Sequence, residues 1–174
     1  MQSFDSGPSD AVQALMLASR AFVALTARSL ASVEGEITVP QFRTLVVLAV
    51  RGPQRSVDIA DELRVNPSTG TRMLDRLIRK GLVRRTRSAT DRRVVQVRLT
   101  PTGRSVVEQV LTLRRAELER LAAETADLWQ PAVTEALTAF AQAVGEVSEH
   151  DWWLGWDAHR PDASESDEIE AAAT

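Results

Sequence analysis

The 174-residue chain contains no cysteine and no tyrosine, and it has only two histidines. Without cysteine it can form no disulfide, no thiolate metal site and no thiol that senses oxidants. Two histidines leave little for a metal centre, so we expect neither a metal nor a cofactor. No glycine-rich phosphate loop and no carboxylate pair stands out in a folded segment, and we therefore do not expect an enzyme.

Targeting signals are also missing from the sequence. The first ten residues, MQSFDSGPSD, lack the basic and apolar stretches of a secretory signal. No stretch approaches the ~18 consecutive apolar residues of a membrane span. With 44% hydrophobic and 26% charged residues, the composition is typical of a globular domain. We expect a cytoplasmic protein that does not contact a membrane.

Positive charge is confined to the middle of the chain. The window from Arg55 to Arg104 holds 13 Arg or Lys and 5 Asp or Glu, a net charge of +8, whereas the remainder carries −11. Twelve of the 13 basic residues are arginine, whose planar fork suits phosphates and guanine edges. A basic middle between acidic ends indicates one surface that binds a polyanion.

The hydrophobic pattern predicts helices separated by capping residues and breakers. Thr38, Ser56 and Thr100 are suited to N-caps, and Gly52 and Gly81 to helix ends. The expected helices span about residues 10–32, 39–51, 57–63, 67–80, 101–128 and 131–147. The third and fourth are joined by a turn so short that they form a helix-turn-helix.

Two short runs after this motif, Val83–Arg87 and Val94–Leu99, alternate between apolar and basic residues, as two antiparallel strands with one buried face would. The fold class is therefore mainly α with a small β-hairpin wing. On the fourth helix, steps of 100° place an apolar side opposite a polar one, with Thr71 and Arg76 at the margins. The apolar side comprises Gly70, Met73, Leu74 and Leu77, and the polar side Ser68, Arg72, Asp75 and Arg79.

These segments together resemble the MarR (multiple-antibiotic-resistance regulator) family of winged-helix repressors. The resemblance covers about Asp10 to Ser148 and is carried by VPQFRTLVVL and by SVDIADELRVNPSTGTRMLDRLIRKGLVRRTRSATDRRVVQVRLTPTGR. Its most specific part is the wing turn Asp91-Arg92-Arg93, followed by a β-run and LTPTG. The missing cysteine excludes the peroxide-sensing branch of this family, and the missing tyrosine removes ligand contacts that some relatives make.

The resemblance implies a homodimer that binds an inverted-repeat operator in double-stranded DNA, with half-sites roughly 10 base pairs apart. It also implies a repressor that a small aromatic or phenolic ligand releases. The surplus apolar stripe on the terminal helices likewise indicates a dimer. The implied parts are an N-terminal dimerisation helix (10–35), a winged helix-turn-helix lobe (38–100), C-terminal dimerisation helices (101–150) and a Trp-containing acidic tail, largely disordered at its end (151–174).

We expect the fourth helix to enter the major groove, where Arg72 is the best candidate for a bidentate contact with guanine. Asp75 is expected to orient Arg72 or Arg79. In the wing, the resemblance suggests that Asp91 braces an arginine that reaches the minor groove, although an Asp–Arg pair that only stiffens the turn is the alternative. The predicted DNA-binding residues are Arg55, Ser56, Ser68, Thr69, Thr71, Arg72, Arg76, Arg92 and Arg93.

Two features leave alternatives open. The effector pocket implied by the resemblance would draw on Phe22, Phe42, Arg43, Leu45 and Leu111, all of which except Arg43 are equally suited to a core. The tryptophans near the C-terminus are suited to dock on a partner, cap the helical core or contact a ligand, with packing favoured; they are Trp152, Trp153 and Trp156. The alternative function is a dimeric winged-helix interaction module without sequence-specific DNA binding.

Overall fold

The computed structural model describes residues 8–33, 36–88 and 91–159. Helices account for most of these residues, and one antiparallel hairpin supplies the strands, which confirms the predicted fold class. The elements are α1 (Pro8–Ala31), α2 (Val39–Arg51), α3 (Ser56–Glu62), α4 (Pro67–Arg79), β1 (Val83–Arg87), β2 (Val95–Leu99), α5 (Pro101–Glu124), the 3₁₀ turn η1 (Ala126–Leu128), α6 (Pro131–Ala143) and α7 (Glu149–Ala158).

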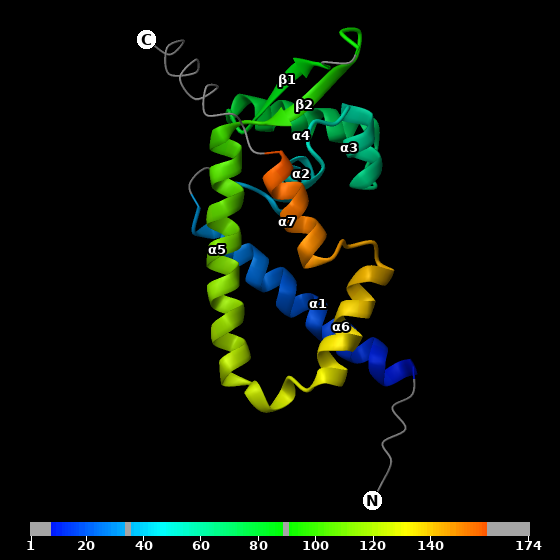
Figure 1. Ribbon diagram of the computed structural model, residues 1–174, viewed down its shortest axis with the longest axis vertical. Helices are drawn as coiled ribbons and strands as arrows, with labels where there is room; N and C mark the ends of the chain where they lie inside the picture. Colours follow the sequence, from blue (N-terminus) through cyan, green and yellow to red (C-terminus); the bar gives the residue numbers. More distant parts are fainter. Residues whose placement is uncertain (1–7, 34–35, 89–90, 160–174) are drawn as a thin grey trace, which may run out of the picture.

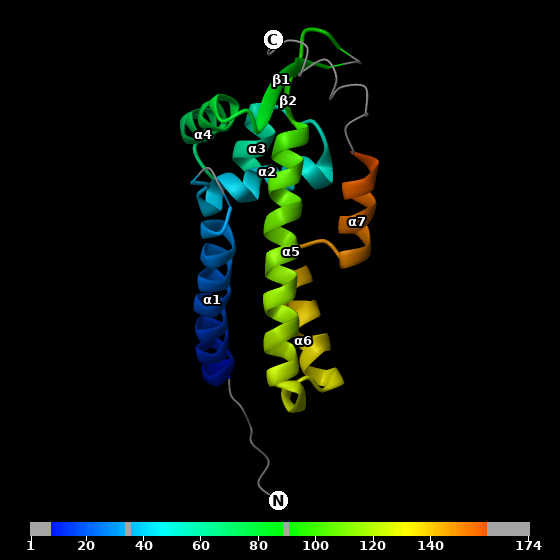
Figure 2. The same ribbon diagram turned by 90° about the vertical axis from the view of Figure 1, so that its left-hand side faces the viewer.

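A lobe of α2, α3, α4 and the hairpin lies at one end of the molecule, and α1, α5 and α6 extend away from it (Figures 1 and 2). The lobe encloses a core of fully buried side chains from all of its helices and both strands, which α5 completes from one side. Arg114 of α5 donates a hydrogen bond to Thr26 of α1 (3.1 Å) and lies over the Phe42 ring of α2 (5.7 Å). The long helices are thus joined to the lobe near its base.

The helix starts in the lobe are fixed by local chemistry. Thr38 and Gln41 form a capping box, in which each side chain accepts a hydrogen bond from the other residue's backbone N–H. Gly52 ends α2 with a φ of 73°, which glycine adopts at little cost. In the helix-turn-helix, a Cβ on Gly70 would lie 2.9 Å from Cβ of Ala60, so glycine permits the close crossing of α3 and α4.

The hairpin pairs Val83 with Leu99 and Arg87 with Val95, and Gln54 adds an isolated bridge to Val97. After β2, Thr100 caps α5 by accepting the N–H of Gly103 (3.0 Å). The predicted strands and the start of the long helix therefore lie where the sequence indicates.

The C-terminal half differs from the expected helices. The long helix ends at Glu124 rather than near residue 128, where η1 follows it, and α6 ends at Ala143 before Gly145, whose φ is 90°. Residues 149–158 form α7 instead of starting a tail. Trp156 is 3% exposed, so packing, the favoured role of the tryptophans, is confirmed for this residue. The side chain of Trp153 and residues 160–174 lie outside the described part, as do residues 1–7, 34–35 and 89–90.

Residues 9–31 of α1 are long and apolar enough to cross a membrane, with a mean hydropathy of 1.3. The expectation that no stretch approaches a membrane span is therefore too strong for this helix. Arg20 and Arg28 lie within it, and its Leu25 and Leu30 are buried against the rest of the chain. These contacts fit a packed amphipathic helix, because a charged residue at the centre of a bilayer is costly.

Candidate nucleic-acid interface

The outer face of α4 is polar and exposed, as the helical spacing predicts. Its inner positions Gly70, Met73, Leu74 and Leu77 are buried, which fixes how the helix is rotated on the lobe. The exposed residues include five of the predicted contacts: Ser68, Thr69, Thr71, Arg72 and Arg76. The Thr71 hydroxyl donates to the carbonyl of Pro67 (2.9 Å), so it can offer a ligand only its acceptor lone pairs while that bond holds.

The sequence suggests that Asp75 orients Arg72 or Arg79, but the structure shows that it orients neither. Its carboxylate forms an ion pair with Arg85 of β1, at 2.8 Å. The chain turns sharply at Gly81 after α4, and the first strand then runs back beside the helix, so that residue 85 meets residue 75. Within the described chain, neither Arg72 nor Arg76 is paired with a carboxylate, and both guanidinium groups reach solvent.

The wing turn is held by its own backbone. Asp91 Oδ1 accepts the N–H of Arg93 (2.9 Å), the N–H of Val94 donates to the Asp91 carbonyl (2.9 Å), and Ser88 N–H donates to the carbonyl of Val94 (2.9 Å). The described contact of Asp91 is therefore with the main chain at Arg93, and the side chains of Arg92 and Arg93 are exposed at the tip. This arrangement presents two positive charges beside main-chain hydrogen bonds at Ser88, Asp91 and Val94.

Arg55 and Ser56 lie at the start of α3. Arg55 binds Asp58 through two hydrogen bonds of 2.8 and 2.6 Å, and this contact lowers the pKa of the Asp58 carboxyl. Arg55 must therefore share its guanidinium between Asp58 and any phosphate. Ser56 is half-buried.

The structure does not bring the five predicted effector residues together. Phe42 and Leu45 are core residues with 4% and 0% exposure, Phe22 is half exposed on α1, and Arg43 pairs with Glu146 at 2.6 Å. Only Leu111, among these five, lines the cavity described next.

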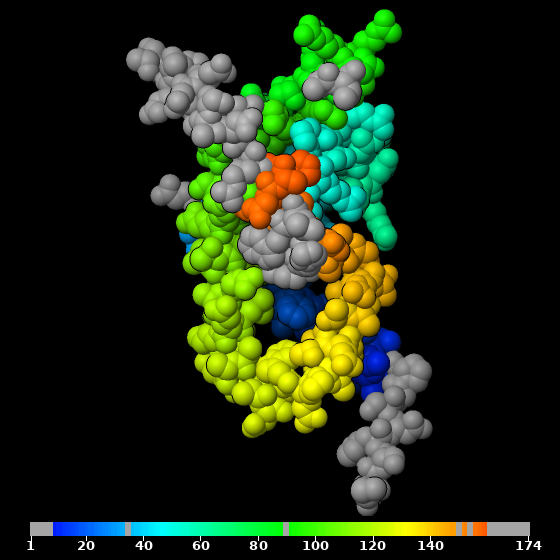
Figure 3. All heavy atoms as spheres, in the orientation of Figure 1, coloured from blue at the N-terminus to red at the C-terminus, as the bar shows by residue number. Residues whose placement is uncertain are grey.

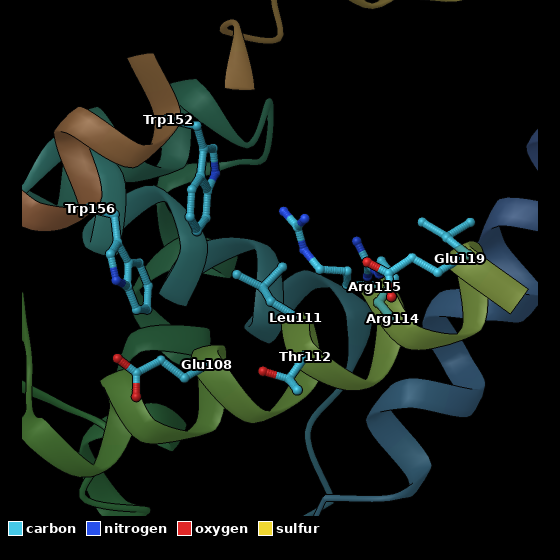
Figure 4. Close-up of a pocket in the computed structure, with 9 residues that line it drawn as sticks. Glu108, Leu111, Thr112, Arg114, Arg115, Glu119, Trp152 and Trp156 are labelled. Carbon is cyan, nitrogen blue, oxygen red and sulfur yellow. The ribbon is translucent and has the colours of Figure 1, made fainter. Parts of the chain in front are cut away.

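A cavity of about 500 Å³ lies between α5 and α7 (Figure 4). Trp152 and Trp156 of α7 face the α5 side chains across it, with their rings stacked at 5.3 Å. Its lining residues are Glu108, Leu111, Thr112, Arg114, Arg115, Leu118, Glu119, Trp152 and Trp156. The sequence indicated a ligand contact only as one of three roles for the tryptophans, because nothing local pairs them with α5.

Arg104 is a residue that the sequence analysis did not single out. It is 5% exposed, and it donates hydrogen bonds to the carbonyls of Trp156 (2.8 Å) and His159 (3.3 Å) at the end of α7. Its guanidinium also lies 3.8 Å from the Trp156 ring centroid. Cations stabilise helix C-termini, so Arg104 fastens α7 to the start of α5. The sequence feature that could have indicated this residue is an arginine directly after the LTPTG motif.

A model of the MarR family matches residues 37–95, which contain the helix-turn-helix and most of the wing. The chain is similar to the HTH-type transcriptional repressor MdtR of Bacillus subtilis, with 38% identity over 84 residues that make up 48% of this chain and 54% of MdtR. It therefore spans about half the length of this curated relative.

Solved structures extend the likeness to most of the chain. RV1404 from Mycobacterium tuberculosis is 41% identical with a TM-score of 0.75, and the match covers 83% of this chain and 99% of that one. A MarR family protein from Bacillus stearothermophilus is 26% identical with a TM-score of 0.65, over 81% of this chain and 100% of that one. Given this agreement across the lobe and the long helices, the chain belongs to the MarR family of transcriptional regulators.

Proposed function

We propose that this chain is a cytoplasmic, non-enzymatic DNA-binding regulator, a dimer that represses transcription from an inverted-repeat operator. The observation that carries the proposal is the exposed face of α4, on which Arg72 and Arg76 have no carboxylate partner within the described chain. This face adjoins the wing at one end of the molecule (Figure 2). The description of MdtR as a repressor supports the direction of control.

Each part of the surface has its own role in this proposal. Arg72 and its neighbours on α4 read base edges in the major groove, with Ser68, Thr69 and Arg76 at bases and nearby phosphates. Arg92 and Arg93 reach the adjoining minor groove, whose narrow AT-rich stretches attract arginine. Arg55 and Ser56, at the start of α3, contact phosphates of the DNA backbone.

The test compares a base-reading with a charge-neutralising substitution. We expect Arg72→Ala to cost about 1–3 kcal/mol at the selected operator and little on random DNA, whereas Arg93→Ala weakens binding to both and flattens the salt dependence. Anisotropy titrations at several salt concentrations measure both effects. Equal losses on operator and random DNA would refute base reading by Arg72. A dimer that binds no duplex at physiological salt would instead favour a protein-interaction module.

The proposed dimer is supported by the exposed apolar side chains on the long helices. None of the residues of α6 is buried, and in the space-filling view α1 shows at the back of a hollow between α5 and α6 (Figure 3). Apolar surface of this extent is rare on monomers. The half-exposed residues here include Val12, Met16, Leu17, Phe22, Val23, Leu128, Val133, Phe140, Val144 and Val147.

Light scattering coupled to size exclusion tests the dimer. We expect the wild type to run as a dimer and Phe140→Glu to shift it toward monomer, because a charge would be buried in the interface. Val57→Glu is the matched control, since Val57 is equally exposed (45% against 46%) but lies on α3. A monomeric wild type would end the proposal of a dimeric regulator.

The releasing ligand is proposed to be a small aromatic or phenolic compound in the cavity between α5 and α7. Indole rings supply flat apolar walls, and Arg114 and Arg115 supply positive charge. A panel of hydroxylated benzoates, titrated against tryptophan emission and against the DNA complex, tests this. Trp152→Leu is expected to weaken both responses. If the ligand releases DNA from the Trp152→Leu variant as readily as from wild type, the ligand binds elsewhere.

A further inference from the structure

The end of α7 is held against the base of the wing. Besides the two hydrogen bonds from Arg104, His159 Nδ1 lies 2.8 Å from the carbonyl of Gly155. His159 also lines a small cavity together with Arg98 and Leu99 of β2. Figures 1 and 2 agree that this end of α7 points toward the wing. Whatever follows residue 159 therefore starts near the base of the wing, whereas α4 lies on the other side of the lobe (Figure 2).

The sequence that follows is strongly acidic. Residues 161–174, PDASESDEIEAAAT, contain five carboxylates and no basic residue, a net charge of −5. The window from Arg55 to Arg104 carries +8, and α4 and the wing display much of this charge to solvent. The acidic segment thus has the same charge sign as the DNA backbone, and it follows a helix that ends near the base of the wing.

The length of the segment is sufficient to reach that surface. Fourteen residues span up to about 45–50 Å when extended. The five residues of β2, from its base near His159 toward the wing tip, span about 17 Å. Carboxylates of the segment can therefore meet arginines of the wing, and the remaining length can extend across the lobe toward α4 (Figure 2).

We propose that residues 161–174 bind the basic surface of α4 and the wing, in competition with DNA phosphates. This inference rests on the proposed DNA-binding function. The segment acts as a tethered polyanion that lowers the affinity of the protein for all DNA. Because operator and random DNA must both displace the segment, it weakens the two by the same factor and sets how much DNA of either kind is bound.

The size of the effect follows from tethering. A short flexible connection gives an effective concentration in the millimolar range. Five carboxylates that bind arginines with a dissociation constant of similar size would weaken DNA binding by roughly two- to tenfold. Exposed ion pairs are screened by salt, so the effect must shrink as the salt concentration rises.

The experiment uses the full-length chain and a random-sequence duplex, since phosphate competition does not require the operator. One variant replaces the five carboxylates (Asp162→Asn, Glu165→Gln, Asp167→Asn, Glu168→Gln and Glu170→Gln), and a control scrambles residues 161–174 at constant composition. In anisotropy titrations we expect the neutralised variant to bind two- to tenfold more tightly than wild type at 50 mM salt, with the difference gone near 300 mM. The scrambled control should match wild type.

A second measurement separates contact from long-range repulsion. Since the chain has no cysteine, Ala172→Cys gives a single site for a nitroxide label. We expect the label to broaden amide signals of α4 and the wing at 50 mM salt and not those of α6, and the broadening to fade at 300 mM. Absent or uniform broadening, or equal affinities of neutralised and wild-type protein at every salt concentration, overturns the inference. Failure of all variants to bind DNA would instead overturn the proposed function.

Discussion

Replacing Arg104 with alanine tests whether α7 is held to α5 by one side chain. Arg104 is buried and gives α7 two charged hydrogen bonds, of 2.8 and 3.3 Å, and a stacking contact with Trp156. A hydrogen bond from a charged donor contributes about 1.5–3 kcal/mol, and a cation over an aromatic ring about 0.5–2 kcal/mol. The longer bond adds less than the shorter, and the freed carbonyls regain water if α7 leaves, so we expect a net loss of about 2–3 kcal/mol.

Two signals locate this loss. Trp156 is 3% exposed, so release of α7 should shift tryptophan emission to longer wavelength at denaturant concentrations where circular dichroism still reports a folded lobe. The matched control is Arg120→Ala on the same helix, whose exposed pairs with Glu117 and Glu124 are screened by solvent and therefore contribute little to stability. Protein concentration is kept constant, because dimerisation contributes to apparent stability. If the two variants lose equal stability with coincident transitions, Arg104 does not hold α7.

Two further predictions concern packing and pH. Gly70→Ala should lower the free energy of unfolding by about 1–3 kcal/mol, because its Cβ would lie 2.9 Å from that of Ala60. Denaturant unfolding measures this loss. An unchanged midpoint would show that the α3–α4 crossing relaxes freely. A hydrogen bond from Arg120 lowers the pKa of Glu117, so its contribution is present above the unfolded pKa of about 4.3 and is lost as the pH falls through the lower folded pKa. The melting temperature of wild type should therefore exceed that of Glu117→Gln at pH 7 and converge with it in acid, and a gap that is constant with pH would contradict this.

Local chemistry explains which parts of the fold the sequence predicted well. The start of α2 is marked by Thr38 and Pro40 and its end by Gly52, and each acts within a turn of its own position. The two faces of α4 follow from its 3.6-residue period alone, because no neighbour needs to be known to place Leu74 inside and Arg72 outside. Boundaries and exposed faces of such segments are therefore readable from sequence.

Contacts between distant segments account for what the sequence missed. Asp75 has arginines one turn away on either side, yet its partner is Arg85, which only the path of β1 brings near. The run that contains Trp152 and Trp156 has no clear apolar period, and Trp156 is buried because α2 and α5 already present a surface for it. The cavity beside these indoles is likewise a property of two helices far apart in the sequence.

The junction between wing and long helix determines how the lobe is oriented. Thr100 donates a hydrogen bond to the carbonyl of Gly81 (2.7 Å), and a Cβ on Gly103 would lie 2.0 Å from the carbonyl oxygen of Leu82, so the start of α5 is pressed against the chain that leaves α4. Arg104, the next residue, holds α7. Because α4, the wing, α5 and α7 meet within these five residues, a change in the angle of α5 must move α4 with it as one body. We therefore expect the proposed ligand between α5 and α7 to alter DNA binding through this junction.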